Sequence, residues 1–227
     1  MKKLQNGFTL AEALITMAII GVIASLTLPA LQVNLQKQQA SSALAKAINT
    51  LETANKLALE ENHARTLNQL SEQNYFDDVL GDYVGWQVAS LGKKYTEYAN
   101  TTEYSTGAEN MHTTKDGITF LHKPEAPTSL EEEKLKELGL GYGGSYYTVY
   151  IDTNGNNKGP NALGKDLFYV AVDTKGSVIP YGGADWKAYS GEDIMWTGDG
   201  CGNPKINPTQ PLSCSGSIAD NGFKVIY

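Results

Sequence analysis

The sequence contains few residues whose types and spacing could perform chemistry. Its three histidines, His63, His112 and His122, do not have the spacing of metal ligands, and no glycine-rich phosphate loop follows a strand pattern. A Gly-x-Ser-x-Gly motif, which would present a nucleophilic serine, is also missing. The 227 residues carry a formal net charge of -7 without a cluster of Lys or Arg, so we expect no nucleic-acid partner. These observations predict a protein that is not an enzyme.

One segment could bind a cation through oxygen atoms. It begins at Asp152 and carries Asp and Asn at alternate positions, as in Asn154, and such side chains can bind Ca²⁺. An EF-hand loop has glycine at its sixth position, whereas Gly155 is fourth here and no bidentate glutamate follows. Asp166 and Asp173 could contribute if the fold brings them close. Calcium at Asp152 and Asn154 is therefore one interpretation. The sequence favours the other, a turn-rich loop whose side chains bond their own backbone, and we expect no other cofactor.

The remaining candidate is Glu12, a carboxylate inside a segment that is otherwise apolar. The apolar run extends from Phe8 to Leu31, 24 residues, and a helix of this length spans roughly 36 Å. The hydrocarbon core of a bilayer is about 30 Å thick, so the run can cross it. Lys2 and Lys3 would keep the N-terminus cytoplasmic, and the rest of the chain would be exported. An ionisable group in such a helix usually has a functional partner.

The residues Gly-Phe-Thr-Leu-Ala-Glu, from Gly7 to Glu12, follow a short basic leader and precede the apolar helix. This arrangement resembles the processing signal of type IV pilins and type II secretion pseudopilins, and the resemblance covers about residues 1–55. It implies that a prepilin peptidase cuts after Gly7 and that the new N-terminal residue, Phe8, is N-methylated. It also implies that Glu12 approaches the Phe8 amine of a neighbouring subunit in a filament. The alternative for Glu12 is a position near the lipid headgroups.

The resemblance implies a structural subunit of a type IV pilus or of a type II secretion filament. Its partners would be prepilin peptidase, other pilin or pseudopilin subunits, the inner-membrane assembly machinery and membrane lipid. The chain would reside in the cytoplasmic membrane with an exported head, and would then enter a periplasmic or cell-surface filament. The alternative is a membrane-tethered minor pilin whose head binds a ligand. Glu12 favours a subunit of the filament body, whereas the signal itself is common to pili and secretion filaments.

The elements that position these residues follow from the sequence pattern. We expect a leader at residues 1–7, a transmembrane and stem helix at residues 8–61, and a globular head at residues 62–227. Pro29 removes one backbone hydrogen bond and would bend the helix. Beyond it, apolar residues recur at spacings of three and four, which indicates a helical stripe rich in alanine that packs against the head: Ala40, Ala43, Leu44, Ala47, Ile48, Leu51, Ala54 and Ala58.

The head pattern predicts an α+β fold, in which a small antiparallel sheet packs on the long helix. Expected strands are Ile118 to His122, Tyr146 to Asp152, Leu167 to Asp173 and Ser177 to Tyr181, and the last two flank a hairpin turn at Thr174-Lys175-Gly176. A capping box at Ser129 predicts a short helix from Leu130 to Leu138. The polar segment from Lys93 to His112 is expected to be a surface loop.

The two cysteines, Cys201 and Cys214, lie near the C-terminus and would be exported with the head. Paired thiols outside the cytoplasm usually oxidise. A bridge would close a 14-residue loop and contribute roughly 3 kcal/mol, and several type IV pilins have a similar C-terminal disulfide loop. Two free thiols or a metal pair is the alternative, although no other metal ligands stand nearby at suitable spacing. We therefore expect a Cys201–Cys214 disulfide.

Overall fold

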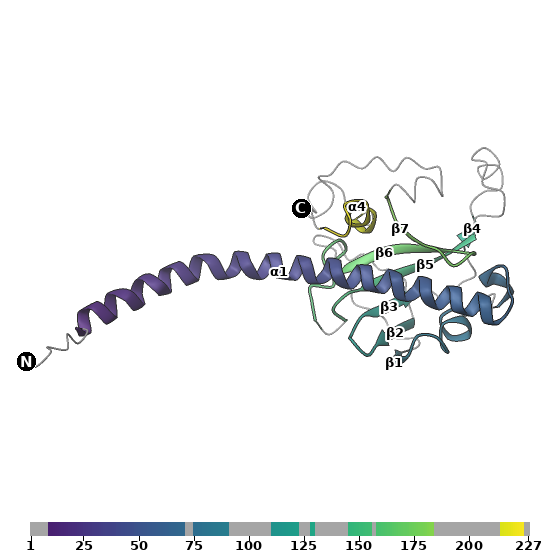
Figure 1. Ribbon diagram of the computed structural model, residues 1–227, viewed down its shortest axis with the longest axis horizontal. Coiled ribbons are helices and arrows are strands. Elements are labelled where there is room, and N and C mark those ends of the chain that lie inside the picture. The colour runs from purple at the N-terminus through teal and green to yellow at the C-terminus, as the bar shows by residue number, and fades with distance from the viewer. Residues whose placement is uncertain are drawn as a thin grey trace, which may run out of the picture. The chain divides into compact units, whose positions relative to one another are not determined.

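The structure is a computed structural model of the chain and describes residues 9–70, 75–90, 110–122, 128–129, 145–155, 158–183 and 214–224. The chain divides into two compact units, Met1–Gln39 and Ala40–Tyr227. The helix α1 (Leu10–Glu61) contributes its first part to one unit and its second part to the other (Figure 1). The predicted long N-terminal helix is confirmed.

In the first unit, α1 carries apolar residues on all of its sides from Leu10 to Leu31, and polar residues become frequent from Gln32 onward. Large apolar side chains from Leu10 to Leu35 are exposed, with 81% exposure at Leu10 and 75% at Leu26. Pro29 lies inside the helix. Among the described residues, α1 alone is long and apolar enough to cross a membrane by length and composition. Such a surface is suited to lipid or to other apolar helices, because in water it would expose a large apolar area.

In the second unit, α1 buries a narrow stripe against the head. The buried residues are Ser41, Leu44, Ala47, Ile48, Leu51, Ala54, Asn55 and Ala58. Six of them belong to the predicted stripe, whose other two members, Ala40 and Ala43, are partly buried, whereas Ser41 and Asn55 were not predicted. The buried alanines of the stripe have almost no exposed surface, and Ala47 and Ala58 are completely buried. Their small side chains allow the helix backbone to approach the sheet closely.

The described strands form one antiparallel sheet, to which α1 adds a helical layer (Figure 1). Their order is β1-β2-β3-β5-β6-β7, and β4 pairs with β5 outside this path. The strands are β1 (Trp86–Ser90), β2 (Asn110–Thr114), β3 (Thr119–His122), β4 (Thr128–Ser129), β5 (Ser145–Asp152), β6 (Leu167–Asp173) and β7 (Val178–Pro180). The described helical elements after α1 are the 3₁₀-helix η1 (Leu67–Gln69), the π-helix η2 (Tyr75–Val79) and α4 (Cys214–Asp220). The α+β fold class is therefore confirmed.

Alternation along the central strands decides which side chains face the helix. In β5, Val149 pairs with Val170 of β6, and both belong to the core cluster that contains the α1 stripe. The next residue, Tyr150, pairs with Tyr169 and belongs to a second cluster with Leu121 and Leu167. Successive side chains point to opposite faces of a strand, and here each face carries a buried cluster.

The four strands expected from the sequence are present, with ends within one residue of the prediction. The sequence pattern did not indicate β1, β2, β4 or α4. The predicted loop from Lys93 to His112 is wrong at its C-terminal end, because Asn110, Met111 and His112 belong to β2. The sequence did not indicate this strand because most of its residues are polar. In the fold, Met111 pairs with Leu121, and His112 packs in an aromatic core. The predicted helix at 130–138 lies outside the described residues.

The hairpin between β6 and β7 is fixed to α1 by a buried polar contact. The side-chain amide of Asn55 donates a hydrogen bond of 3.0 Å to the carbonyl of Gly176, and the hydroxyl of Tyr75 donates to Asn55 Oδ1. Burial raises the pKa of the Tyr75 hydroxyl. Gly176 has a φ of +88°, and a Cβ there would lie 2.8 Å from Cβ of Asn55. The turn therefore requires glycine both for its conformation and for its distance from the helix.

The helix α4 packs equally closely on the turn after β7. The N–H group of Gly216 donates a hydrogen bond of 3.1 Å to the carbonyl of Tyr181. A Cβ at Gly216 would lie 2.0 Å from the backbone nitrogen of Gly183. Beyond α4, the hydroxyl of Ser41 donates to the carbonyl of Phe223, which ties the end of the described chain to α1.

We predict that Gly216→Ala lowers the free energy of unfolding by roughly 3 kcal/mol, because the added methyl group must displace α4 from the turn. Gly85→Ala is the matched control, since nothing lies within 4 Å of a Cβ at that position, and its effect should stay within about 1 kcal/mol. Denaturant unfolding of the purified chain, followed by tryptophan fluorescence, measures both. Equal stability of the two variants would show that α4 does not depend on this contact.

Candidate functional site

The start of α1 forms a capping box between Thr9 and Glu12. The backbone N–H and the hydroxyl of Thr9 each lie 2.8 Å from Glu12 Oε2, and the N–H of Glu12 donates to Thr9 Oγ1 at 3.3 Å. The carbonyl of Thr9 accepts the first intrahelical bond from the N–H of Ala13. Thr9 is therefore the N-cap residue, and Glu12 occupies the third helical position, as the motif requires.

The sequence analysis did not predict that Glu12 forms a capping box with Thr9, although the sequence pattern for one is present. Thr9-x-x-Glu12 has the same Ser/Thr-x-x-Glu form that we used to predict a helix at Ser129. The negative charge also lies in the first turn of the helix, where the helix dipole favours it. Among the described residues, the carboxylate bonds only through Oε2. Gly7 and Phe8, the predicted sites of cleavage and methylation, lie outside the described residues.

The loop that follows β5 brings the predicted calcium residues together. Asp152 is completely buried, and its Oδ1 atom accepts from the N–H groups of Asn154 and Gly155 at 3.0 and 2.9 Å. Asp166 accepts from the Asn154 side chain at 3.1 Å and from two backbone N–H groups. Asp173 instead accepts from the N–H groups of its own hairpin turn.

These bonds follow the pattern of a turn-rich loop, in which the Asp and Asn side chains bond nearby backbone groups. In the part of the chain that the structure describes, no three His, Cys, Asp or Glu residues form a group that could hold a metal ion. A calcium site at Asp152 and Asn154 stays a prediction.

Two of the three histidines belong to an aromatic core. The rings of His112 and His122 are buried and have centroids 5.4 Å apart, and both stack on Phe76. Atom Nε2 of His112 lies 2.9 Å from Oδ1 of Asp77, a partner that the sequence did not indicate. His63 lies after the end of α1 and is exposed. The arrangement is one of core packing.

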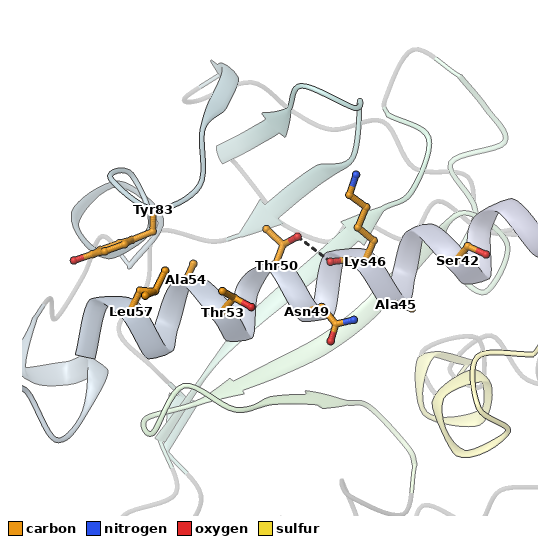
Figure 2. A pocket seen from close by; sticks show the side chains of 9 residues that line it. All are labelled: Ser42, Ala45, Lys46, Asn49, Thr50, Thr53, Ala54, Leu57 and Tyr83. Carbon is orange, nitrogen blue, oxygen red and sulfur yellow. Dashed lines mark hydrogen bonds between the residues drawn. The ribbon is translucent and has the colours of Figure 1, made fainter. Parts of the chain in front are cut away.

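A groove of about 620 Å³ follows the exposed face of α1 (Figure 2). It is lined by Ser42, Ala45, Lys46, Asn49, Thr50, Thr53, Ala54, Leu57 and Tyr83. Most of these side chains are small or polar and reach solvent. Small-molecule sites are usually enclosed and apolar, so the groove lacks the character of a ligand pocket.

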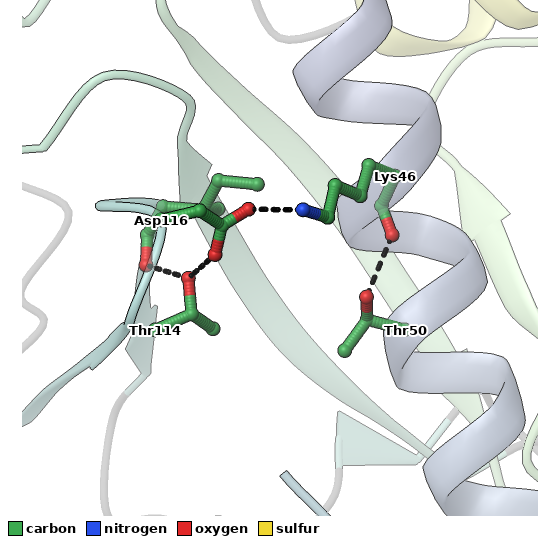
Figure 3. Close-up of polar contacts among 5 residues, drawn as sticks. Lys46, Thr50, Thr114 and Asp116 are labelled. Atoms are coloured by element: carbon green, nitrogen blue, oxygen red, sulfur yellow. Dashed lines mark hydrogen bonds and ion pairs between the residues drawn. The ribbon is translucent and has the colours of Figure 1, made fainter. Parts of the chain in front are cut away.

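The cation of this groove, Lys46, is paired with the turn between β2 and β3. Its Nζ atom lies 2.6 Å from Oδ2 of Asp116, whose Oδ1 accepts from the hydroxyl of Thr114 at 2.6 Å (Figure 3). The hydrogen bond from Lys46, followed by the one from Thr114, holds the pKa of the Asp116 carboxyl below its usual value. The pair connects the turn to α1.

Of the two cysteines, the structure describes Cys214, the first residue of α4, which is completely buried in the core that contains the α1 stripe. Cys201 lies outside the described residues. The Cys201–Cys214 disulfide therefore stays a prediction.

Comparison with known proteins identifies the segment that contains the capping box. Residues 2–28 match the family model of the prokaryotic N-terminal methylation motif, which is the type IV pilin and pseudopilin signal. The match includes Gly7, Phe8, Thr9 and Glu12, and it supports a pilin-like protein. No curated protein and no solved structure matches the chain.

We predict that Asp116→Asn destabilises the head at neutral pH by about 0.5 kcal/mol, because the exposed pair with Lys46 is lost. The lowered pKa of Asp116 means that its contribution is present above the unfolded pKa of an aspartate and is lost as the pH falls through the folded pKa. The difference in the free energy of unfolding between Asp116→Asn and the natural chain should therefore vanish in acid. Unfolding curves at pH 7 and at about pH 2 test this, and Lys46→Gln should give the same loss at pH 7. A difference that persists in acid would contradict it.

Proposed function

We propose that the chain is a structural subunit, a pilin or pseudopilin, of a type IV pilus-like or type II secretion filament. The observation that carries the proposal is the continuity of the methylation signal at residues 2–28 with a membrane-length helix whose apolar side chains are exposed. Proteins with this signal are structural subunits rather than enzymes. The chain is expected to be anchored in the cytoplasmic membrane with its head exported.

Processing by prepilin peptidase is the first step of the proposed function. The cut after Gly7 removes the leader and creates a positively charged amine on Phe8, which is then methylated. Before the cut, the N-terminus of the helix has a lysine-containing leader that lies on the cytoplasmic side. Afterwards it has a single charge four residues before Glu12. The cut therefore gives Glu12 its potential partner.

Assembly through the N-terminal helix is the second step. The exposed apolar side chains of residues 10–35 are well solvated by lipid. Placing the charged Glu12 carboxylate in lipid, in contrast, costs free energy. In a filament, the same side chains contact the helices of other subunits, and Glu12 pairs with the Phe8 amine of a neighbour. A wrong register leaves a buried carboxylate without its partner, and this penalty is larger than the net gain of the pair itself. Glu12 therefore selects the register of the subunits.

The head supplies a stable exported domain to this filament. Its sheet packs on the alanine-rich stripe of α1, and the Asn55–Gly176 and Ser41–Phe223 contacts fix the sheet and the C-terminal segment to the same helix. The proposed Cys201–Cys214 disulfide would add a covalent link at the start of α4. A membrane-tethered minor pilin whose head binds a ligand is the alternative; the groove that the described residues form on α1 is open to solvent, which gives this alternative less support.

We predict that Glu12→Leu subunits are inserted and processed normally but fail to assemble. Leucine is more favourable than glutamate in a membrane helix, and the cut lies on the other side of Phe8. Loss of one partner of a buried ion pair should reduce the ratio of sheared filament to mature membrane subunit by more than about tenfold. Mass spectrometry of the N-terminus defines the mature pool, which should begin at Phe8.

Ile15→Leu is the control, since it conserves the apolar surface of the same helix and should assemble normally. If Glu12→Leu assembles normally, the Glu12 carboxylate is not needed for assembly. The alternative function, a membrane-tethered ligand-binding module, would then be favoured. A chain that keeps Met1 in cells with an active prepilin peptidase would contradict the proposal at its first step.

A further inference from the structure

Two histidines of the head share one buried environment. His112 of β2 has no exposed surface, and His122 of the neighbouring strand β3 is 5% exposed. Their ring centroids are 5.4 Å apart, and the ring of Phe76 in η2 stacks on both. Trp86 of β1 packs against His112 at 5.1 Å. These two residues, the histidine pair, are therefore two groups that can gain a proton inside an aromatic cluster.

The two nitrogens of His112 have different surroundings. Nε2 lies 2.9 Å from Oδ1 of Asp77, whereas Nδ1 is buried and has no hydrogen-bond partner in the described part of the chain. An ionised carboxylate can only accept, so the hydrogen of a neutral His112 ring lies on Nε2. A proton added to Nδ1 would therefore create a buried donor without an acceptor, and such a donor costs free energy.

Few groups can balance a positive charge on the histidine pair. The ring contacts of His112 come from η2, β1 and β3. From η2, Asp77 reaches His112 with a side chain that is 43% exposed, and its neighbour Asp78 is exposed to solvent. Tyr75 of the same helix stays neutral, because burial raises the pKa of its hydroxyl. Trp86 of β1 carries no charge. Among the described residues, Asp77 is thus the carboxylate that pairs with His112.

One such carboxylate compensates for one proton at most. A protonated His112 would form an ion pair with Asp77, but a second proton, on His122, would place two positive rings 5.4 Å apart in a cluster that is shielded from water. In the unfolded chain, each histidine gains its own proton near pH 6.5. Below this pH the unfolded chain therefore binds more protons than the folded head does, so the stability of the head falls as the pH falls.

We propose that the histidine pair is a pH-sensitive lock in the head. At neutral pH the uncharged rings hold η2 and β1 on the sheet through Phe76 and Trp86. In acid, one excluded proton favours the open or unfolded head about 25-fold more at pH 5 than at pH 7. A head outside the cytoplasm would experience the external pH directly. This inference concerns the fold of the head and does not depend on filament assembly.

The test measures the unfolding constant of the full chain in detergent at pH 7 and at about pH 5, by denaturant unfolding followed by tryptophan fluorescence. Other carboxylates add to the pH dependence, so each variant is compared with the natural chain. His122→Phe keeps an aromatic ring and leaves His112 alone beside Asp77. The increase in the unfolding constant between the two pH values should be about 25-fold smaller in this variant. His63→Gln is the matched control, because it removes an exposed histidine, and it should behave like the natural chain.

A second measurement counts protons in the folded head. NMR of the natural chain with ¹³C-labelled histidine reports the protonation of each ring, and His63→Gln assigns the signal of His63. Over the same pH range, His63 and one ring of the pair should gain a proton, whereas the other ring should remain neutral. Two protonated rings in the folded head, or equal pH dependence of His122→Phe and the natural chain, would overturn the proposal. If His122→Phe does not fold at pH 7, the NMR titration decides.

Discussion

The position of one carboxylate in an apolar helix constrains the rest of this molecule. Glu12 lies in the first turn of α1, among side chains that are exposed and apolar as far as Leu35. In an apolar medium its charge requires hydrogen bonds and a counter-charge. The capping box with Thr9 supplies the hydrogen bonds in the isolated subunit. The counter-charge must come from elsewhere, and cleavage after Gly7 would create one at Phe8. In the proposed function, processing, capping and assembly thus depend on the same few residues at the start of the chain.

The helix that carries this carboxylate has two different chemical characters. Its first part presents apolar side chains in every direction, which suits lipid or other helices. Its second part buries only a stripe, and its remaining face is polar, with Lys46 paired to Asp116. The buried alanines let the sheet approach, and Asn55 fixes the β6–β7 hairpin through the carbonyl of Gly176. One continuous helix is therefore apolar enough to cross a membrane in its first part and belongs to the core of the head in its second.

The sequence predicted the features that depend on strong local patterns. The period of α1 is visible because its buried residues recur every three or four positions. The strands β5 and β6 are visible because they are rich in β-branched and aromatic residues, and the turn at Gly176 because its φ of +88° favours glycine. The strand β2 was not visible, since His112 is polar in sequence but stacks on Phe76 in the core. The helix α4 was also missed, because Gly216 is unfavourable in an isolated helix and is required here only by its contact with Gly183. At the candidate site, the pilin signal was recognised, but the capping function of Thr9 was not.

The central claim is that Glu12 of one subunit pairs with the Phe8 amine of another. Solid-state NMR can measure this in filaments assembled from two subunit populations, one labelled with ¹⁵N in phenylalanine and the other with ¹³C in glutamate. The amine of Phe8 is distinct in chemical shift from every amide nitrogen. The account predicts dipolar contact between this amine and a glutamate carboxylate carbon at about 4 Å, the distance of a close ion pair. Filaments that form without any such contact between the two populations would contradict it.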